Sequence, residues 1–110
     1  MHLQGYLSVD ASEDAVSFGF SVENTGAEPV DIHFSSGKTA DVTVFREGTE
    51  IWRWSDGRMF TQLLRTETIA PGESITHDCR WDYPSPGYYS AEATLEATNV
   101  DLVERVEFEV

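Results

Sequence analysis

The sequence is short of positive charge. Seven lysines and arginines stand against 20 aspartates and glutamates, which gives a formal net charge of −13, and Lys38 is the only lysine. Nucleic acids are bound through lysine and arginine side chains that displace counterions from the phosphates, so a chain this acidic would repel them. The same repulsion excludes binding to an anionic membrane surface.

The acidic residues are spread through almost every segment instead of being gathered in a tail. This distribution is typical of a solvating surface that keeps a protein soluble. Together with the shortage of lysine, it indicates a halophilic, haloarchaeal-like protein of a high-salt cytoplasm, where salt screens the self-repulsion within a few ångströms. The alternative is an acidic decoy that mimics DNA or docks on a basic partner, which would require rows of carboxylates at phosphate spacing.

The chain also lacks disulfide partners and long apolar runs. Cys79 is the single cysteine, so no intramolecular disulfide is possible and the core must rely on packing. No stretch approaches the roughly 20 apolar residues of a membrane-spanning helix. The first residues, Met1–Gly5, have neither the basic start nor the apolar run of a signal peptide. We therefore expect a cytoplasmic protein.

Apolar residues do not recur at helical spacing but alternate with polar ones, as in residues 16–23. Turn residues separate the alternating stretches. Nine segments are expected to form short strands, at residues 3–9, 16–22, 30–34, 42–45, 51–54, 61–68, 74–81, 89–97 and 106–110. A length of 110 residues fits one domain, residues 1–110.

Short strands with a turn about every 8 to 12 residues are typical of a sandwich or barrel, and the length suits an immunoglobulin-like domain. We predict an all-β fold, an immunoglobulin-like antiparallel β-sandwich of eight or nine strands in two sheets. Glu47-Gly48 is expected to turn a hairpin. Tyr89 is the candidate for a tyrosine corner, a tyrosine hydroxyl bonded back to the backbone, and Trp52 or Trp54 for the large core aromatic.

No arrangement of residues indicates catalysis, so we predict that the chain is not an enzyme. The serines lack the flanking glycines of a nucleophile elbow. His77 and Cys79 are expected on the inward face of one strand, whereas thiol catalysis needs an exposed thiol beside an imidazole and a third group to orient it. A buried, unreactive thiol is the favoured interpretation.

No metal or cofactor is expected either. His33, His77 and Cys79 are possible zinc ligands, but a fourth ligand is missing. The acidic cluster 10–14 lacks the spacing of a calcium loop and is expected to form a solvated turn between the first two strands.

With these segments located, the chain resembles the intracellular proteinase inhibitor family, BsuPI. The motifs that carry the resemblance are Phe20–Gly26, Pro29–Gly37, Ile51–Ser55, Phe60–Gln62, Ala70–Ser74, and Trp81 with Pro86–Tyr89, which together cover about residues 15–97. Trp-Arg-Trp-Ser with Phe-Thr-Gln close behind is the discriminating part. The resemblance implies an immunoglobulin-like fold and inhibition of an intracellular subtilisin-like serine protease.

Two loops suit such a protein-binding role. The stretch 54–60 carries Trp54, Arg58, Met59 and Phe60, and the stretch 82–87 carries Tyr83, Pro84 and Pro86. Arginine, methionine and aromatic residues are enriched at binding hot spots, and prolines lower the entropic cost of ordering a loop. The alternative is that the aromatic residues pack in the core or at its rim and that both loops are ordinary connections.

A second functional class stays open. The domain could be a structural or assembly module that pairs through an edge strand with a copy of itself or with a larger partner. The inhibitor hypothesis and the assembly hypothesis differ in whether the protein lowers protease activity and in the oligomeric state that they predict. The sequence does not indicate the oligomeric state.

Overall fold

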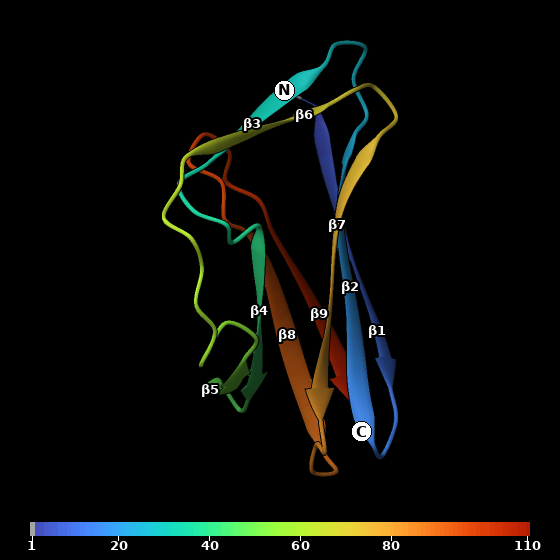
Figure 1. Ribbon diagram of the computed structural model, residues 1–110. Helices are drawn as coiled ribbons and strands as arrows, with labels where there is room; N and C mark the ends of the chain where they lie inside the picture. The colour runs from blue at the N-terminus through green and yellow to red at the C-terminus, as the bar shows by residue number, and fades with distance from the viewer. Residues whose placement is uncertain (1) are drawn as a thin grey trace.

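The computed structural model describes residues 2–110, which form nine β-strands (Figure 1). In chain order these are β1 (Leu3–Ala11), β2 (Ala15–Asn24), β3 (Val30–Phe34), β4 (Ala40–Arg46), β5 (Thr49–Arg53), β6 (Arg65–Ile69), β7 (Ser74–Asp82), β8 (Tyr88–Leu95) and β9 (Val103–Glu109). Among the described residues there is no helix long and apolar enough to cross a membrane.

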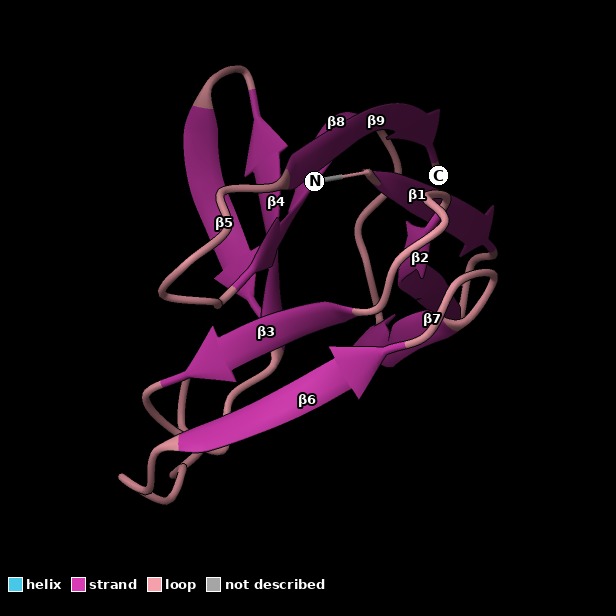
Figure 2. Ribbon diagram, turned by 90° about the horizontal axis from the view of Figure 1, so that it is seen from above, coloured by secondary structure: helices cyan, strands magenta, loops and turns pink. Residues whose placement is uncertain are grey.

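The strands form two main sheets and one small one, all with antiparallel neighbours. One main sheet has the order β1-β2-β7 and the other β5-β4-β8-β9, while β3 and β6 pair by themselves across one end of the molecule (Figure 2). The main sheets have the order of an immunoglobulin-like sandwich. The predicted fold class is therefore confirmed, but the prediction of two sheets is wrong because β3–β6 forms a third.

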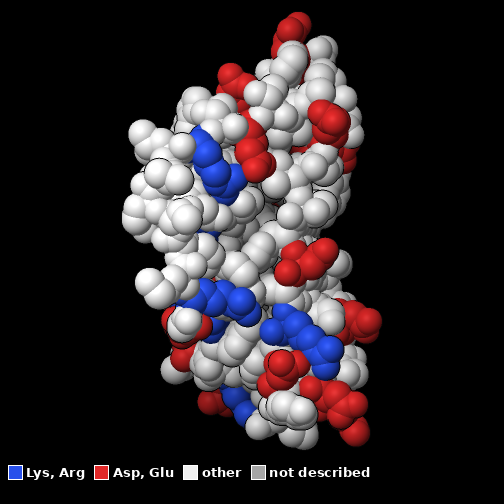
Figure 3. Space-filling view, viewed as in Figure 1, with Lys and Arg blue, Asp and Glu red and all other residues white. Residues whose placement is uncertain are grey.

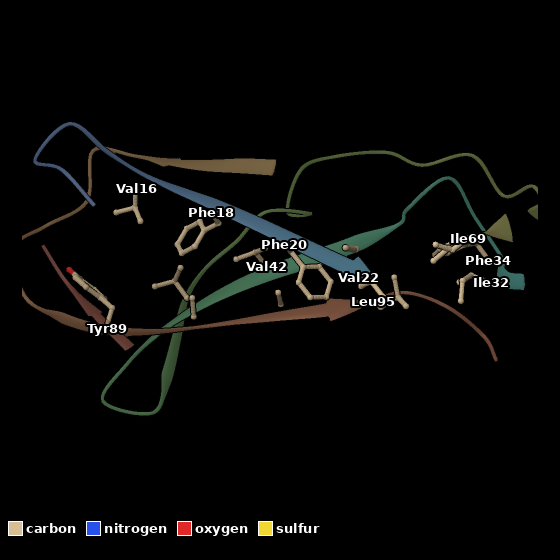
Figure 4. Close-up of a cluster of buried hydrophobic side chains, with 14 residues drawn as sticks. Val16, Phe18, Phe20, Val22, Ile32, Phe34, Val42, Ile69, Tyr89 and Leu95 are labelled. Atoms are coloured by element: carbon tan, nitrogen blue, oxygen red, sulfur yellow. The ribbon is translucent and has the colours of Figure 1, made fainter. Parts of the chain in front are cut away.

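The core lies between the two main sheets and is built by alternating side chains. Val16, Phe18, Phe20 and Val22 of β2 are all buried and face the second sheet (Figure 4). Fully burying one such side chain stabilises the fold by about 1.5–3 kcal/mol. Strand β4 differs, because five consecutive residues, Ala40–Val44, are buried and so both of its faces are covered.

The two sides of the sandwich are closed differently. On one side β1 lies against β9, so closely that a Cβ on Gly5 would come within 2.6 Å of a Leu102 methyl carbon. On the other side β5 and β7 are the edge strands of their sheets. Aromatic rings fill the space between them, with Trp52 stacked on Trp81 at 6.2 Å between centroids.

Two local predictions are confirmed. Glu47 and Gly48 turn the β4–β5 hairpin with φ values of 52° and 80°, which is the positive region that such two-residue turns require. The Tyr89 hydroxyl donates a hydrogen bond of 2.5 Å to the Ser85 carbonyl, so Tyr89 forms the tyrosine corner before β8.

Two of the family-like motifs meet at the end of β2. The backbone of Asn24 accepts a hydrogen bond from Gly72 and donates one to Glu73, at 2.8 and 3.0 Å. The buried Asn24 side chain donates to the carbonyls of Glu28 and Ile69. The Asn-Thr-Gly and Pro-Gly-Glu turns thus hold one another in place, which is a structural role.

The predicted strand at 61–68 is only partly present. Strand β6 begins at Arg65, and residues 58–64 belong to no strand. Trp54 likewise lies just beyond the end of β5 instead of within it. The connection between β5 and β6 is therefore longer than predicted, and it runs along the outside of the sandwich from the level of β5 to that of β6 (Figure 1).

Candidate protein-binding site

The connection of residues 54–64, called here the β5–β6 segment, begins with a tight turn. Trp54 donates a backbone hydrogen bond to the Val42 carbonyl at 2.9 Å, which continues the pairing of β4 for one more residue. Arg58 then donates to the Ser55 carbonyl, and Gly57 has a φ of 77°. Glycine adopts this conformation without steric cost, which explains its position in the turn.

A buried carboxylate anchors the start of the segment. Asp41 is 2% exposed and accepts hydrogen bonds from the Ser55 hydroxyl at 2.6 Å and from the Ser55 backbone amide at 3.2 Å. Lys38 and Arg53 pair with it at 2.8 and 3.4 Å. Burial by itself would raise the pKa of Asp41, but the bonds from Lys38 and Ser55 outweigh it and lower the pKa. Asp41 is therefore ionised and fully paired.

The aromatic residues of the segment pack together beside β7. Trp54 contacts His77 edge-to-face at 4.4 Å, and Phe60 lies 5.7 Å from Trp54. The Arg58 guanidinium lies 4.6 Å from the Trp54 ring, and its Nε donates to the Trp54 carbonyl at 2.9 Å. The structure thus brings Trp54, Arg58 and Phe60 together, while Met59 projects outward with 98% of its surface exposed.

A second set of contacts fixes the far end of the segment. The Thr61 carbonyl accepts a hydrogen bond from Gly37 at 2.9 Å. A Cβ on Gly37 would lie 2.7 Å from the Thr61 hydroxyl, so this close approach requires glycine. Arg65 lies 4.1 Å from the Phe34 ring and donates to the Ser36 carbonyl at 3.0 Å.

Between these anchors the segment exposes aliphatic side chains. Leu63 is 70% exposed and Leu64 is 85% exposed, and Met59 lies nearby in the sequence. Three large apolar side chains are thus exposed within six residues of one segment, and exposed apolar patches mark interaction sites. Because residues 61–68 were predicted to form a strand, the two leucines were not predicted to be exposed. Neighbouring residues of a strand point to opposite faces, so adjacent leucines cannot both face the core, and this pattern in the sequence could have indicated that at least one is exposed.

The second candidate loop is held along its whole length. Tyr83 donates a backbone hydrogen bond to the Asp14 carbonyl, Ser85 accepts the bond from Tyr89, and Gly87 exchanges two backbone bonds with Val110. Tyr83 is 86% exposed. Pro86 is exposed as well, but Pro84 is buried, so only part of the loop can meet a partner through its side chains.

The two candidate loops do not form one surface. Trp54 packs on His77, near the middle of β7, whereas Tyr83 comes directly after the last residue of that strand. The six steps from His77 to Tyr83 span about 20 Å at the rise of an extended strand. A partner that binds one loop through a small contact would not reach the other.

His77 and Cys79 lie on the inward face of β7 and do not form a reactive pair. Burial raises the pKa of the Cys79 thiol to about 12, so the thiolate needed for nucleophilic attack is not populated near neutral pH. Burial likewise lowers the pKa of His77, and its Nε2 has no hydrogen-bond partner among residues 2–110. In the described chain no three His, Cys, Asp or Glu side chains are grouped to hold a metal ion.

Solved structures similar to this chain share its fold. A β-glucosidase from Kluyveromyces marxianus matches 98% of the chain with a TM-score of 0.54 and 14% identity, although the chain spans 14% of that enzyme's length. A CARDB domain from Pyrococcus furiosus matches 98% of the chain with a TM-score of 0.49 and 19% identity, over 89% of the domain. At these identities the likeness concerns the fold alone. No curated protein matches the sequence.

The family comparison is more specific. Residues 3–100 match the family described as intracellular proteinase inhibitor, BsuPI, which extends the motif-based resemblance at both ends. The prediction that the chain is not an enzyme is confirmed by this match, because the family is described by inhibition and not by a catalytic activity. The chain belongs to the intracellular proteinase inhibitor (BsuPI) family.

Proposed function

We propose that this protein inhibits an intracellular serine protease of the subtilisin type by presenting the β5–β6 segment to the substrate cleft of the protease. The observation that carries the proposal is the exposure of Met59, Leu63 and Leu64 on a segment fixed at both ends. Family membership supports inhibition in general. The segment supplies a physical means for it.

The anchoring supports tight binding for an entropic reason. A flexible peptide loses conformational freedom when a cleft orders it, and a loop ordered in advance loses less. Asp41 holds the start of the segment through Ser55, and Gly37 holds Thr61 near its end. Extended peptides bind clefts by backbone pairing with a strand edge while their side chains fill pockets.

Pairing through the edge of β5, one form of the assembly alternative, finds less support. β5 is a short edge strand of five residues, and its register with β4 shifts between Val44 and Phe45. Short and irregular edges protect a sheet against pairing with another chain.

A further part of the proposal is that the protein works as one domain, residues 1–110, in a high-salt cytoplasm, and its charge distribution supports the high-salt setting. Residues 1–37 contain no lysine or arginine. Positive groups are instead spread over the face that carries β5 and β7, with acidic groups among them (Figure 3). On this proposal the free energy of unfolding rises from low salt to molar KCl as self-repulsion is screened, and a flat or falling curve would contradict it.

The experiment is a titration of subtilisin with the purified protein in molar KCl, with hydrolysis of a peptide substrate as the readout. The wild-type chain is expected to lower hydrolysis at micromolar concentration. The triple variant Met59→Ser, Leu63→Ser, Leu64→Ser should lose this effect, whereas Tyr83→Ser on the other loop should keep it. Undiminished hydrolysis with the wild-type chain would refute the proposal, and light scattering would then test self-assembly.

A further inference from the structure

The arginines at the two ends of the β5–β6 segment are folded back onto the protein. Arg58 lies over the Trp54 ring and donates its Nε proton to the Trp54 carbonyl. Arg65 lies over the Phe34 ring, donates to Ser36 and Thr39, and pairs with Glu67 at 2.7 Å. Neither guanidinium is free to enter a deep pocket of a partner without losing these contacts.

One stretch of free backbone in the segment lies between two anchors. Thr61 is bonded to Gly37, and Arg65 is paired with Phe34 in the β3–β6 sheet. Within residues 2–110 nothing donates a hydrogen bond to Gln62, Leu63 or Leu64 or accepts one from them. These three residues can therefore offer their N–H and C=O groups to the strand edges of a cleft, and Leu63 is the central one.

Met59 is more exposed than Leu63 but is placed less well. The residue before it, Arg58, uses its backbone N–H in the turn to Ser55, and the residue after it, Phe60, packs on Trp54. A protease that took the Met59 side chain into its pocket would have to displace the backbone bond of Arg58 on one side and the packing of the Phe60 ring on Trp54 on the other.

We propose that Leu63 is the residue that enters the primary specificity pocket of the protease, with Leu64 directly after the bond that faces the catalytic serine. This inference rests on the proposed function. It also defines the partner, because serine proteases select the residue before the scissile bond through that pocket, and an apolar pocket accepts leucine while an acidic pocket requires arginine or lysine. The target is thus a protease that cleaves after large apolar residues.

The test moves a positive charge along the segment. Leu63→Arg is compared with Leu64→Arg and Met59→Arg, each measured against subtilisin and against trypsin. Leu63→Arg should weaken inhibition of subtilisin by about a hundredfold or more, because an unpaired charge would enter an apolar pocket, and should create inhibition of trypsin. The other two variants should change subtilisin inhibition by less than about tenfold and gain nothing against trypsin. Thermal unfolding checks that all three fold.

A second readout separates this inference from the proposed function. Mass spectrometry of the wild-type chain after brief exposure to subtilisin locates the first bond that is hydrolysed. If the bond between Leu63 and Leu64 is hydrolysed first, the assignment of Leu63 to the specificity pocket is supported. If that bond is hydrolysed first but the protease is not inhibited, the protein is a substrate, so the proposed function is wrong while the assignment of Leu63 stands.

Three outcomes would overturn the assignment. If Leu64→Arg or Met59→Arg, and not Leu63→Arg, creates inhibition of trypsin, the assignment of Leu63 is wrong while the proposed function stands. First cleavage at another bond of the segment leads to the same conclusion. A chain that is neither cut nor inhibitory removes both.

Discussion

The β5–β6 segment and the β7–β8 loop (residues 83–87) are both irregular connections with aromatic residues, yet the protein holds them in opposite ways. The loop is bonded along its length, through Tyr83, Ser85 and Gly87. The segment is bonded to the rest of the protein through Trp54 and Ser55 at its start and through Thr61 farther along. The loop is thus a structural corner with an exposed tyrosine, whereas the segment leaves a stretch of backbone unused.

This difference teaches that exposure alone does not distinguish a binding loop from a corner. Tyr83 and Leu64 are exposed to nearly the same extent, 86% and 85%. What separates them is the backbone, since the amide of Tyr83 is bonded to Asp14 and that of Leu64 is not bonded within residues 2–110. A cleft that binds extended chains forms hydrogen bonds with backbone groups as well as contacts with side chains.

The largest effect is expected when the anchor of the segment is removed. Asp41→Ala should lower the free energy of unfolding by about 3 kcal/mol, because several charge-assisted hydrogen bonds are lost and two cations lose their partner. Urea unfolding measures the loss. Asp78→Ala, which removes an exposed carboxylate of β7, is the control and should cost less than about 0.5 kcal/mol. Equal effects of the two variants would show that Asp41 is no anchor.

The tyrosine corner of Tyr89 can be disrupted without changing the β5–β6 segment. Tyr89→Phe keeps the ring but leaves the Ser85 carbonyl without its donor, so the free energy of unfolding should fall by about 1–3 kcal/mol. Protease inhibition should be unchanged in the folded variant, since the β5–β6 segment is not involved. Tyr83→Phe, at an exposed position of the same loop, is the matched control. A Tyr89→Phe variant as stable as the control would contradict the structural role of the corner.

The sequence predicted the corner better than the segment, for physical reasons. The alternation of apolar and polar residues predicted the strands, and Gly87-Tyr88-Tyr89 predicted the corner, because both are local patterns in the sequence. The start of the segment depends on a buried aspartate, and Asp41 could not be told from the other acidic residues, which are mostly exposed in proteins. Its partner Ser55 lies 14 residues away. Such long-range pairing is not visible in a local pattern.

A third prediction concerns pH and the packing beneath the segment. Burial lowers the pKa of His77 in the folded state below the usual histidine value of about 6.5. The unfolded chain therefore takes up a proton first, so the contribution of neutral His77 is complete above pH 6.5 and is lost as the pH falls toward the folded pKa. The loss from this group cannot exceed about 1.4 kcal/mol per pH unit.

Unfolding measured between about pH 7 and about pH 5 tests this prediction. His77→Phe should flatten the curve in that range, whereas His33→Gln, at an exposed site on β3, should not. Asp41 contributes to acid sensitivity only at lower pH, because the bonds from Lys38 and Ser55 hold its folded pKa below the usual aspartate range. An unchanged slope in His77→Phe would show that the ring beneath Trp54 does not control the acid response.

The smallest change in the free energy of unfolding is expected for replacement of the two leucines, and it tests whether they stabilise the fold or bind a partner. Leu63→Ser and Leu64→Ser should each change the free energy of unfolding by less than about 0.5 kcal/mol, because both side chains are already largely exposed in the folded state. Leu95→Ser in the buried core should cost several times more. If either surface variant lost more than about 1 kcal/mol, the leucines would be packing residues and the segment would resemble the corner. Unchanged stability combined with lost inhibition would mean that their apolar surface serves a partner and not the fold.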